Sequence, residues 1–304
     1  MANRPMLVQV RELWGYRSLI WTMIERDLRV RYKNSILGIF WSMITPLAQA
    51  FILTLVIGFI LGAGPRNMSA YILCAFIPWF FFQTAIMDAS QAVLSQIGLI
   101  KKIYFPREIP VIATTGASLI HLCISLVVFV IYRWGILTLV FRSWPGLPPK
   151  QIVFLPVVIL ILFLLTLGLS FLVAAMNVFY EDVKFIVGVL LMLQMYLAPI
   201  MYFPENIFYS PRIPEHWRSL LYHLYLVNPI AWTIDAFKQV FFPRLLLPIG
   251  ASLRGGVPCG PRAEVLTAQF SVHYCLLALV VSCVVCVYGY SRFNAAKWTF
   301  TERP

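Results

Sequence analysis

The side chains whose types could support chemistry are few and widely separated. Cys283 and Cys286 form a C-x-x-C pair, a spacing used for redox or metal chemistry in soluble proteins. His121 and His273 lie in apolar segments, where histidines can relay protons. Packing in a helix bundle also accounts for both patterns. We favour cysteines packed between helices and histidines hydrogen-bonded to a neighbouring helix.

The sequence lacks the motifs that would assign a reaction. None of the patterns G-x-x-x-x-G-K-S/T, H-E-x-x-H or G-x-S-x-G occurs among the 304 residues. Carboxylates are nearly absent from the apolar segments, with Asp88 near the end of one. Ion-coupled transporters and membrane enzymes both need such groups. We therefore expect no catalytic residue, no metal and no cofactor on this chain.

The elements that must position these residues are predicted to be membrane helices. Hydrophobic residues make up 61% of the chain and charged residues 12%, against about 25% charged in soluble domains. Six long stretches contain no Lys, Arg, Asp or Glu, and about 20 apolar residues suffice to cross a bilayer. The sequence predicts an all-α polytopic membrane protein, a single domain over residues 1–304, with transmembrane helices over 36–62, 68–95, 109–132, 151–177, 185–204 and 266–291.

The charge distribution predicts the orientation. A net charge of +12 on a soluble protein would raise nucleic acid as a partner. Here the basic residues gather before the first apolar stretch and around residues 101–107, and short cytoplasmic segments of membrane proteins collect Lys and Arg. We therefore expect a cytoplasmic (inner) membrane protein with both termini in the cytoplasm and no nucleic-acid partner.

Residues 11–33 are predicted to form one amphipathic helix on the cytoplasmic surface of the membrane. The apolar stripe recurs at steps of three and four residues, as Leu13, Tyr16, Ile20, Ile24 and Leu28. The opposite face carries Glu25, Arg26, Arg29 and Lys33. A basic flank that merely sets the topology is the alternative reading, and it is compatible with the first.

Two short cytoplasmic segments could bind another protein. Residues 98–110, GLIKKIYFPREIP, combine basic and apolar side chains, with Leu99, Tyr104 and Phe105 expected to be exposed. Insertion of these apolar residues into the membrane interface is the alternative. The second segment, around residues 177–184, carries Glu181 and Asp182.

The opposite side of the membrane is predicted to hold a re-entrant segment over residues 205–242. Residues 219–232 are apolar but too short to span, and Asn228-Pro229 predicts a turn within them. We expect two short half-helices here, followed by a Gly- and Pro-rich loop over residues 243–262.

Four segments carry a resemblance to a known family. They are residues 26–47 (RDLRVRYKNSILGIFWSMITPL), 99–110 (LIKKIYFPREIP), 177–183 (NVFYEDV) and the pair Asn228-Pro229. In this order they closely resemble the transmembrane subunit of ABC-2 type exporters, in particular the permeases that export O-antigen, capsule or teichoic acid chains. Two departures from the family are Gly98, where relatives often have Asn, and the length of segment 243–262.

The resemblance implies a homodimer paired with two copies of a separate ATPase, which would hold ATP and Mg. The residues implied to couple to that ATPase are Leu99, Lys101, Lys102, Tyr104, Phe105, Arg107, Glu108, Glu181 and Asp182. Residues 11–33 would be the family's interface helix. The cargo would be a polysaccharide, driven through a conduit between the two copies.

Aromatic side chains suit such a cargo, because the apolar face of a sugar packs on a ring while its hydroxyls stay hydrated. The candidates for lining the channel are Trp41, Phe80, Phe81, Tyr196, Tyr202 and Phe203. Aromatic residues at the ends of spans also form interfacial belts, which is the alternative for each. Two other functions stay open: an ABC-2 exporter of a small lipid or drug, and a membrane-embedded transferase.

Overall fold

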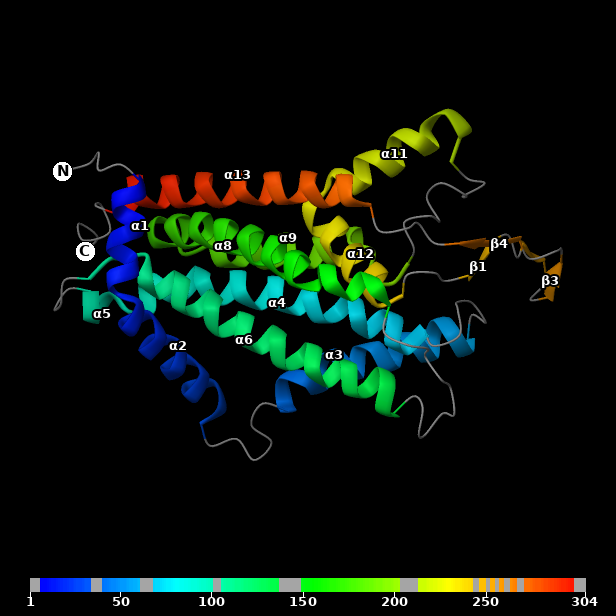
Figure 1. Ribbon diagram of the computed structural model, residues 1–304, viewed down its shortest axis with the longest axis horizontal. Coiled ribbons are helices and arrows are strands. Elements are labelled where there is room, and N and C mark those ends of the chain that lie inside the picture. The colour runs from blue at the N-terminus through cyan, green and yellow to red at the C-terminus, as the bar shows by residue number, and fades with distance from the viewer. Residues whose placement is uncertain are drawn as a thin grey trace.

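The protein is an elongated bundle of helices. The computed structural model describes residues 6–33, 40–60, 68–100, 105–136, 149–202, 213–242, 246–249, 252–254, 257–259, 263–266 and 271–297. The long helices run along the longest axis of the molecule (Figure 1). Helices α1, α2 and α5 gather at one end, and the strands lie at the other.

The helices account for nearly all of the regular structure. They are α1 (Met6–Gly15), α2 (Arg17–Tyr32), α3 (Phe40–Thr54), α4 (Met68–Ser95), α5 (Ile97–Ile100), α6 (Ile109–Ile131), α8 (Leu155–Phe179), α9 (Val183–Leu197), α11 (Glu215–Val227), α12 (Pro229–Phe241) and α13 (Val272–Ala296). A π-helical segment, Leu55–Ile60, continues α3, and another, Tyr132–Ile136, continues α6. A 3₁₀ turn, Lys150–Phe154, precedes α8.

Within the described residues, four helices are long and apolar enough to cross a membrane: Met68–Ser95, Ile109–Gly135, Lys150–Phe179 and Val272–Ala296. They coincide with four of the six spans predicted from the sequence. The other two predicted spans, 36–62 and 185–204, correspond to shorter apolar helices, Ile44–Ile57 and Val183–Leu197. Part of the span 36–62 lies outside the described residues.

Helix α9 ends earlier than predicted, and a proline explains why. Ala198 adopts φ −80° and ψ 147°, an extended conformation that ends the helix. Pro199 follows it, and the ring of a proline disfavours helical geometry in the residue before it. The predicted span 185–204 is therefore an α-helix only as far as Leu197.

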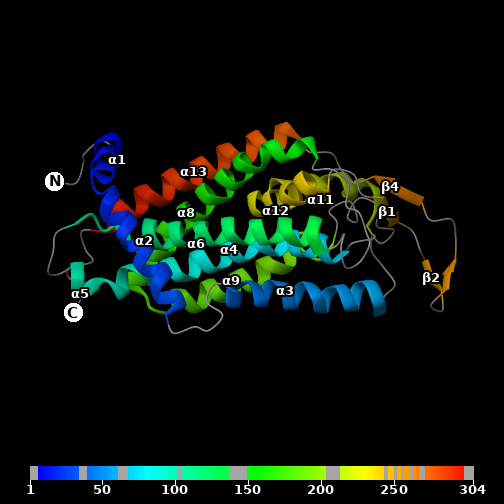
Figure 2. The same ribbon diagram turned by 60° about the horizontal axis from the view of Figure 1, so that its bottom comes forward.

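Helix α4 is the centre of the bundle. It packs against α3, α6, α8, α9 and α12, and 78% of its most apolar window is buried (Figure 2). Phe76, Trp79 and Ile72 are fully enclosed. Because α4 is apolar all round, it suits a position surrounded by other helices.

Helices α8 and α13 form the closest pair. A Cβ atom built on Gly289 would lie 2.1 Å from the carbonyl oxygen of Gly168, and one built on Gly168 would lie 2.6 Å from the backbone of Cys286. Glycine is therefore required at both positions, since small residues let helix backbones approach each other in membranes. Cys286 contributes backbone to this contact, whereas Cys283 is exposed, so the prediction that both cysteines pack between helices is wrong for Cys283.

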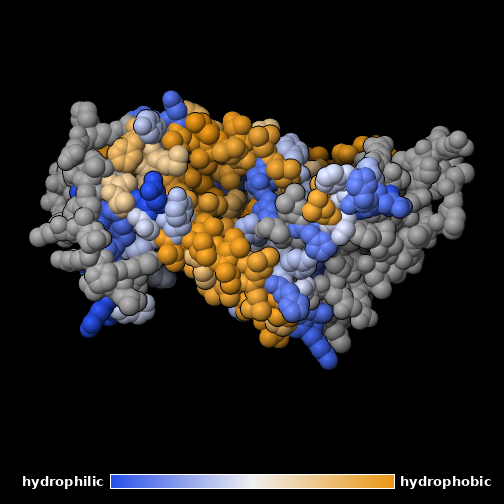
Figure 3. Space-filling model, turned by 90° about the horizontal axis from the view of Figure 1, so that it is seen from above, coloured by the Kyte–Doolittle hydropathy of each residue, from blue (hydrophilic) through white to orange (hydrophobic). Residues whose placement is uncertain are grey.

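The middle of the molecule has an apolar surface. Seen from above, an orange band separates two more polar ends (Figure 3). Exposed valines on α13, among them Val280, Val284 and Val287, contribute to the apolar surface. An apolar surface of this extent suits contact with lipid rather than water.

Four short strands depart from the predicted all-α architecture. β1 (Leu246–Ile249) pairs antiparallel with β4 (Ala263–Leu266), and β2 (Ser252–Arg254) pairs antiparallel with β3 (Val257–Cys259). The prediction of a loop over residues 243–262 is wrong at β1, β2 and β3. The Gly and Pro content of this segment concealed short runs such as Leu-Leu-Pro-Ile, which pairs with Ala-Glu-Val-Leu just beyond the segment.

The single helix predicted over residues 11–33 is two helices. A turn at Tyr16 separates α1 from α2, and the backbone N–H of Tyr16 donates to the carbonyl of Leu13. Gly15 precedes the turn and favours a helix end there. Lys33, predicted as the last residue of the helix, instead follows α2 with an extended backbone.

Candidate functional site

The apolar stripe of α2 packs against α6. Met23 and Ile24 are buried in one cluster with Ile109, Ala113 and Ala117 of α6. Leu13, Tyr16, Ile20 and Leu28 pack around the same cluster. The stripe therefore binds the protein itself, while Trp14 and Trp21 stay 72% and 61% exposed and are suited to the headgroup layer.

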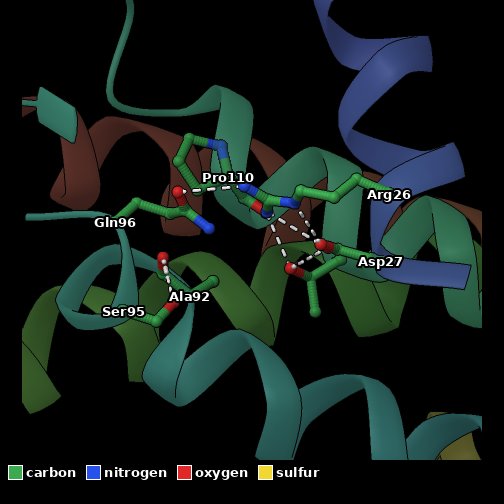
Figure 4. A network of polar contacts seen from close by, with 7 residues as sticks. Arg26, Asp27, Ala92, Ser95, Gln96 and Pro110 are labelled. Atoms are coloured by element: carbon green, nitrogen blue, oxygen red, sulfur yellow. Dashed lines mark hydrogen bonds and ion pairs between the residues drawn. The ribbon is translucent and has the colours of Figure 1, made fainter. Parts of the chain in front are cut away.

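A polar network links α2 to the ends of two other helices (Figure 4). The guanidinium of Arg26 donates to Gln96, just beyond α4, at 3.1 Å and to Asp27 at 2.8 Å. The Thr114 hydroxyl of α6 donates to the other carboxylate oxygen of Asp27 at 3.4 Å. Arg26 was predicted on the polar face of the helix, but its role in joining α2 to the end of α4 was not.

Other charged residues of α2 differ in what they contact. Arg31 pairs with Asp88 of α4, which ties the helix to the bundle a second time. Glu25 and Arg29 pair with each other at 2.6 Å on an exposed face. Lys33 is exposed. Of the predicted interface residues, Arg26 is thus the one that reaches out of its helix to a described partner on another element.

The segment after α4 lies at the same end of the molecule as α1 and the end of α13 (Figure 1). Leu99 belongs to α5, and Lys101, Lys102 and Tyr104 lie outside the described residues. Arg107 is half-buried.

Phe105 and Glu108 serve internal contacts. Phe105 is 6% exposed and belongs to the cluster between α2 and α6, so the expectation that it is exposed is wrong. Glu108 is 2% exposed and pairs with Lys297, at the end of α13, at 2.5 Å. Gln9 of α1 accepts hydrogen bonds from Tyr290 and Asn294 of α13 beside them.

The turn between α8 and α9 is fixed by an asparagine. The buried Asn177 amide donates to the carbonyl of Ser90 in α4 at 2.9 Å, and its oxygen accepts from the Lys184 backbone N–H at 3.1 Å. Glu181 and Asp182 are exposed at the tip of this turn. The sequence singled out the acidic pair but not Asn177, although a buried polar residue closing an apolar span is a usable signal.

The candidate aromatic residues occupy different environments. Phe81 is buried at 4% exposure, Phe80 is partly buried, and Tyr196 is 56% exposed on α9. The Tyr202 hydroxyl donates to the carbonyl of Leu197 at 2.9 Å. Trp41 lies in α3, and Phe203 lies outside the described residues. The exposed candidate with a described side chain on a helix is therefore Tyr196.

Comparison with known proteins assigns the chain to a family. The family model described as "ABC-2 type transporter" matches residues 18–242, which cover α2 to α12. The chain belongs to the ABC-2 type transporter family. Membership makes it a membrane transport protein rather than an enzyme.

Curated ABC-2 relatives match almost the whole chain. One, an O-antigen export system permease protein RfbA of Myxococcus xanthus, is 27% identical over 272 residues, or 90% of this chain and 93% of the relative. Two RfbA proteins of the same description from Klebsiella pneumoniae are each 22% identical. Their alignments cover 98% and 93% of this chain and 99% and 94% of the relatives. The sites described above fall within residues 18–242, which the family model matches, apart from the contacts made by α1 and α13.

Proposed function

We propose that this chain is the permease subunit of an ATP-driven exporter that moves a lipid-linked polysaccharide, such as O-antigen, across the inner membrane. The observation that carries the proposal is the end-to-end similarity to three permeases named for O-antigen export. The scarcity of charged groups in the apolar helices supports a passive conduit. Transport through such a conduit must be driven by an ATPase on another protein.

The orientation proposed here places α1, α5 and the end of α13 in the cytoplasm. Six apolar helices then cross the membrane, with α3 and α9 as the shorter two, and α2 lies at the inner interface. Helices α11 and α12 form the outer re-entrant pair within residues 205–242. The basic residues of α2, together with Lys101 and Lys102, support this orientation.

The ATPase is proposed to bind the segment 99–108 and the turn with Glu181 and Asp182. Both acidic residues are exposed at the tip of this turn. Phe105 and Glu108 would act from inside, because their contacts with α2, α6 and α13 connect this segment to the bundle. ATP and Mg would be bound by the partner alone.

The conduit is proposed to form between two copies of the chain. Helices α3 and α9 flank α4 and keep exposed apolar faces, which include Phe51, Leu55, Val189 and Tyr196. Tyr196 and Tyr202 would contact a passing sugar chain, and Trp41 and Phe203 stay as further candidates. Phe80 and Phe81 would support the wall from behind, since Phe81 is enclosed within its own protomer.

Reconstitution tests the function directly. The purified chain is placed in vesicles with its co-purifying ATPase, and entry of a lipid-linked polysaccharide is measured with and without ATP. The change Tyr104→Ala should abolish transport and stimulated ATP hydrolysis while membrane insertion stays intact. The change Trp14→Ala, at an exposed site elsewhere on the same end, serves as the control.

The same assay separates the alternatives. If the vesicles transport small lipids or drugs but no polysaccharide, the proposed cargo is wrong and the chain is an exporter of small molecules. ATP hydrolysis by the isolated chain, or normal export by the Tyr104→Ala variant, would overturn the proposed division of labour.

A further inference from the structure

A lysine is enclosed among the apolar helices at the end opposite α1. Lys238 of α12 is 1% exposed. Burying a charge away from water is costly unless the charge is paired and hydrogen-bonded. Ionisable residues inside a membrane bundle are rare for this reason and often mark a functional device.

The ammonium group is held by three different elements. Its Nζ donates to the Tyr71 hydroxyl of α4 at 2.8 Å, and it lies 4.3 Å from the centre of the same ring. Asp235, one turn earlier on α12, is 3.7 Å away and neutralises the charge. Nζ also donates to the carbonyls of Pro199 at 2.5 Å and Tyr202 at 3.4 Å.

The two carbonyls belong to the short segment that follows α9. Pro199 and Tyr202 lie two and five residues beyond Leu197, the last residue of the helix. Ala198, Pro199 and Ile200 are buried, so this end is anchored in the bundle. Within α9 itself the buried residues are Val183 and Leu191. The helix is therefore fixed at its outer end and lightly packed along its length.

Helix α12, which carries Lys238, is itself held firmly in the bundle. Asn228 caps it by accepting from the Ile230 N–H at 3.3 Å, and Pro229 occupies the first turn. Every residue from Ile230 to Phe241 is buried. Asp235 is held in turn by the Gln239 amide at 2.6 Å. A movement of α9 therefore meets a rigid body made of α4 and α12.

We propose that Lys238 is a positioning residue that fixes the outer end of α9, so that this helix pivots there when the conduit opens. The inference rests on the proposed function, because it assigns α9 to the wall of the conduit. Lys238 acts through Pro199 and Tyr202 and does not touch the cargo. It keeps the resting conduit closed. When the ATPase moves the inner end of α9, the helix rotates about the outer end that Lys238 fixes.

The test compares the ion leak with the driven transport. Wild-type chain and variants are reconstituted in vesicles, first without the ATPase to measure the leak of a small ion, then with it to measure polysaccharide export. Lys238→Met keeps the length of the side chain and removes the charge. Tyr71→Phe keeps the ring and removes one hydrogen bond to Nζ. Lys150→Met removes an exposed lysine and is the matched control.

The pivot predicts opposite changes in the two readouts. Lys238→Met should raise the leak and lower export by at least roughly tenfold each, because it removes all three described hydrogen bonds of Nζ and the ion pair with Asp235. Tyr71→Phe should shift both in the same directions by less, and Lys150→Met should change neither. If Lys238→Met does not reach the membrane, Tyr71→Phe decides, because it is the milder change.

Two outcomes overturn the pivot. One is wild-type leak and export in the Tyr71 and Lys238 variants. The other is a proportional loss of both readouts, which is the signature of less folded protein. Failure of the wild type to export polysaccharide with its ATPase would instead refute the proposed function, and the pivot with it.

Discussion

The charged group of Arg26 forms its hydrogen bonds within the protein. It donates to Gln96 at the end of α4 and to Asp27, which also accepts from Thr114 of α6. The planar fork of one guanidinium binds both acceptors at once, and through Asp27 it also connects to α6. Arg26 therefore joins α2 to the segment after α4.

Replacing Arg26 by Ala should uncouple these elements. With a side chain 41% exposed, the loss of stability should be only about 1 kcal/mol after solvent screening. The stimulation of ATP hydrolysis by the complex should fall roughly fivefold, the effect of a change of that size. Arg29→Ala is the control, because Arg29 pairs with Glu25 on an exposed face. Equal activity of the two variants would contradict the prediction.

At the scale of elements, the α8–α13 pair depends on two glycines. Gly289→Ala would place a Cβ atom 2.1 Å from the Gly168 carbonyl oxygen, a backbone atom that cannot turn aside. The helices must separate, which should cost about 3 kcal/mol or more, at the upper end of overpacking effects. Thermal unfolding in detergent measures the loss.

Gly188→Ala is the matched control for this change. Its added Cβ would meet the flexible end of Met87 at 3.9 Å, an ordinary contact. The melting temperature of this variant should stay near that of the wild type. A melting temperature equally unchanged in Gly289→Ala would show that the two helices are not packed as described.

The elements also show what one sequence can predict. The long spans were located because charge is absent over their whole length, and the junction of α11 and α12 because Asn228-Pro229 is a local signal. The partners of Gln96 and Glu108 were not predicted, because they are distant along the chain. Arg26 lies 70 residues from Gln96, and Lys297 lies 189 residues from Glu108. Phe105 was misjudged for the same reason: a hydrophobic loop residue gives no hint of which helix will cover it.

At the scale of the whole molecule, the orientation can be tested by labelling. The six native cysteines are first replaced, and single cysteines are then placed at Glu181 and Glu215. Both positions are exposed, at opposite ends of the bundle. An impermeant maleimide should label the Glu215 position in intact cells and the Glu181 position only after lysis. The reverse pattern would invert the proposed topology and remove the ATPase site.

The shortness of α9 has a consequence for the surrounding lipid. Fifteen residues at about 1.5 Å each extend roughly 22 Å, while the hydrocarbon layer is about 30 Å thick. A mismatch of this kind is relieved by thinning the bilayer or by drawing headgroups and water inward. The bilayer beside this helix should therefore be locally thinner. Thinning would shorten the hydrocarbon distance that a hydrophilic polymer has to cross.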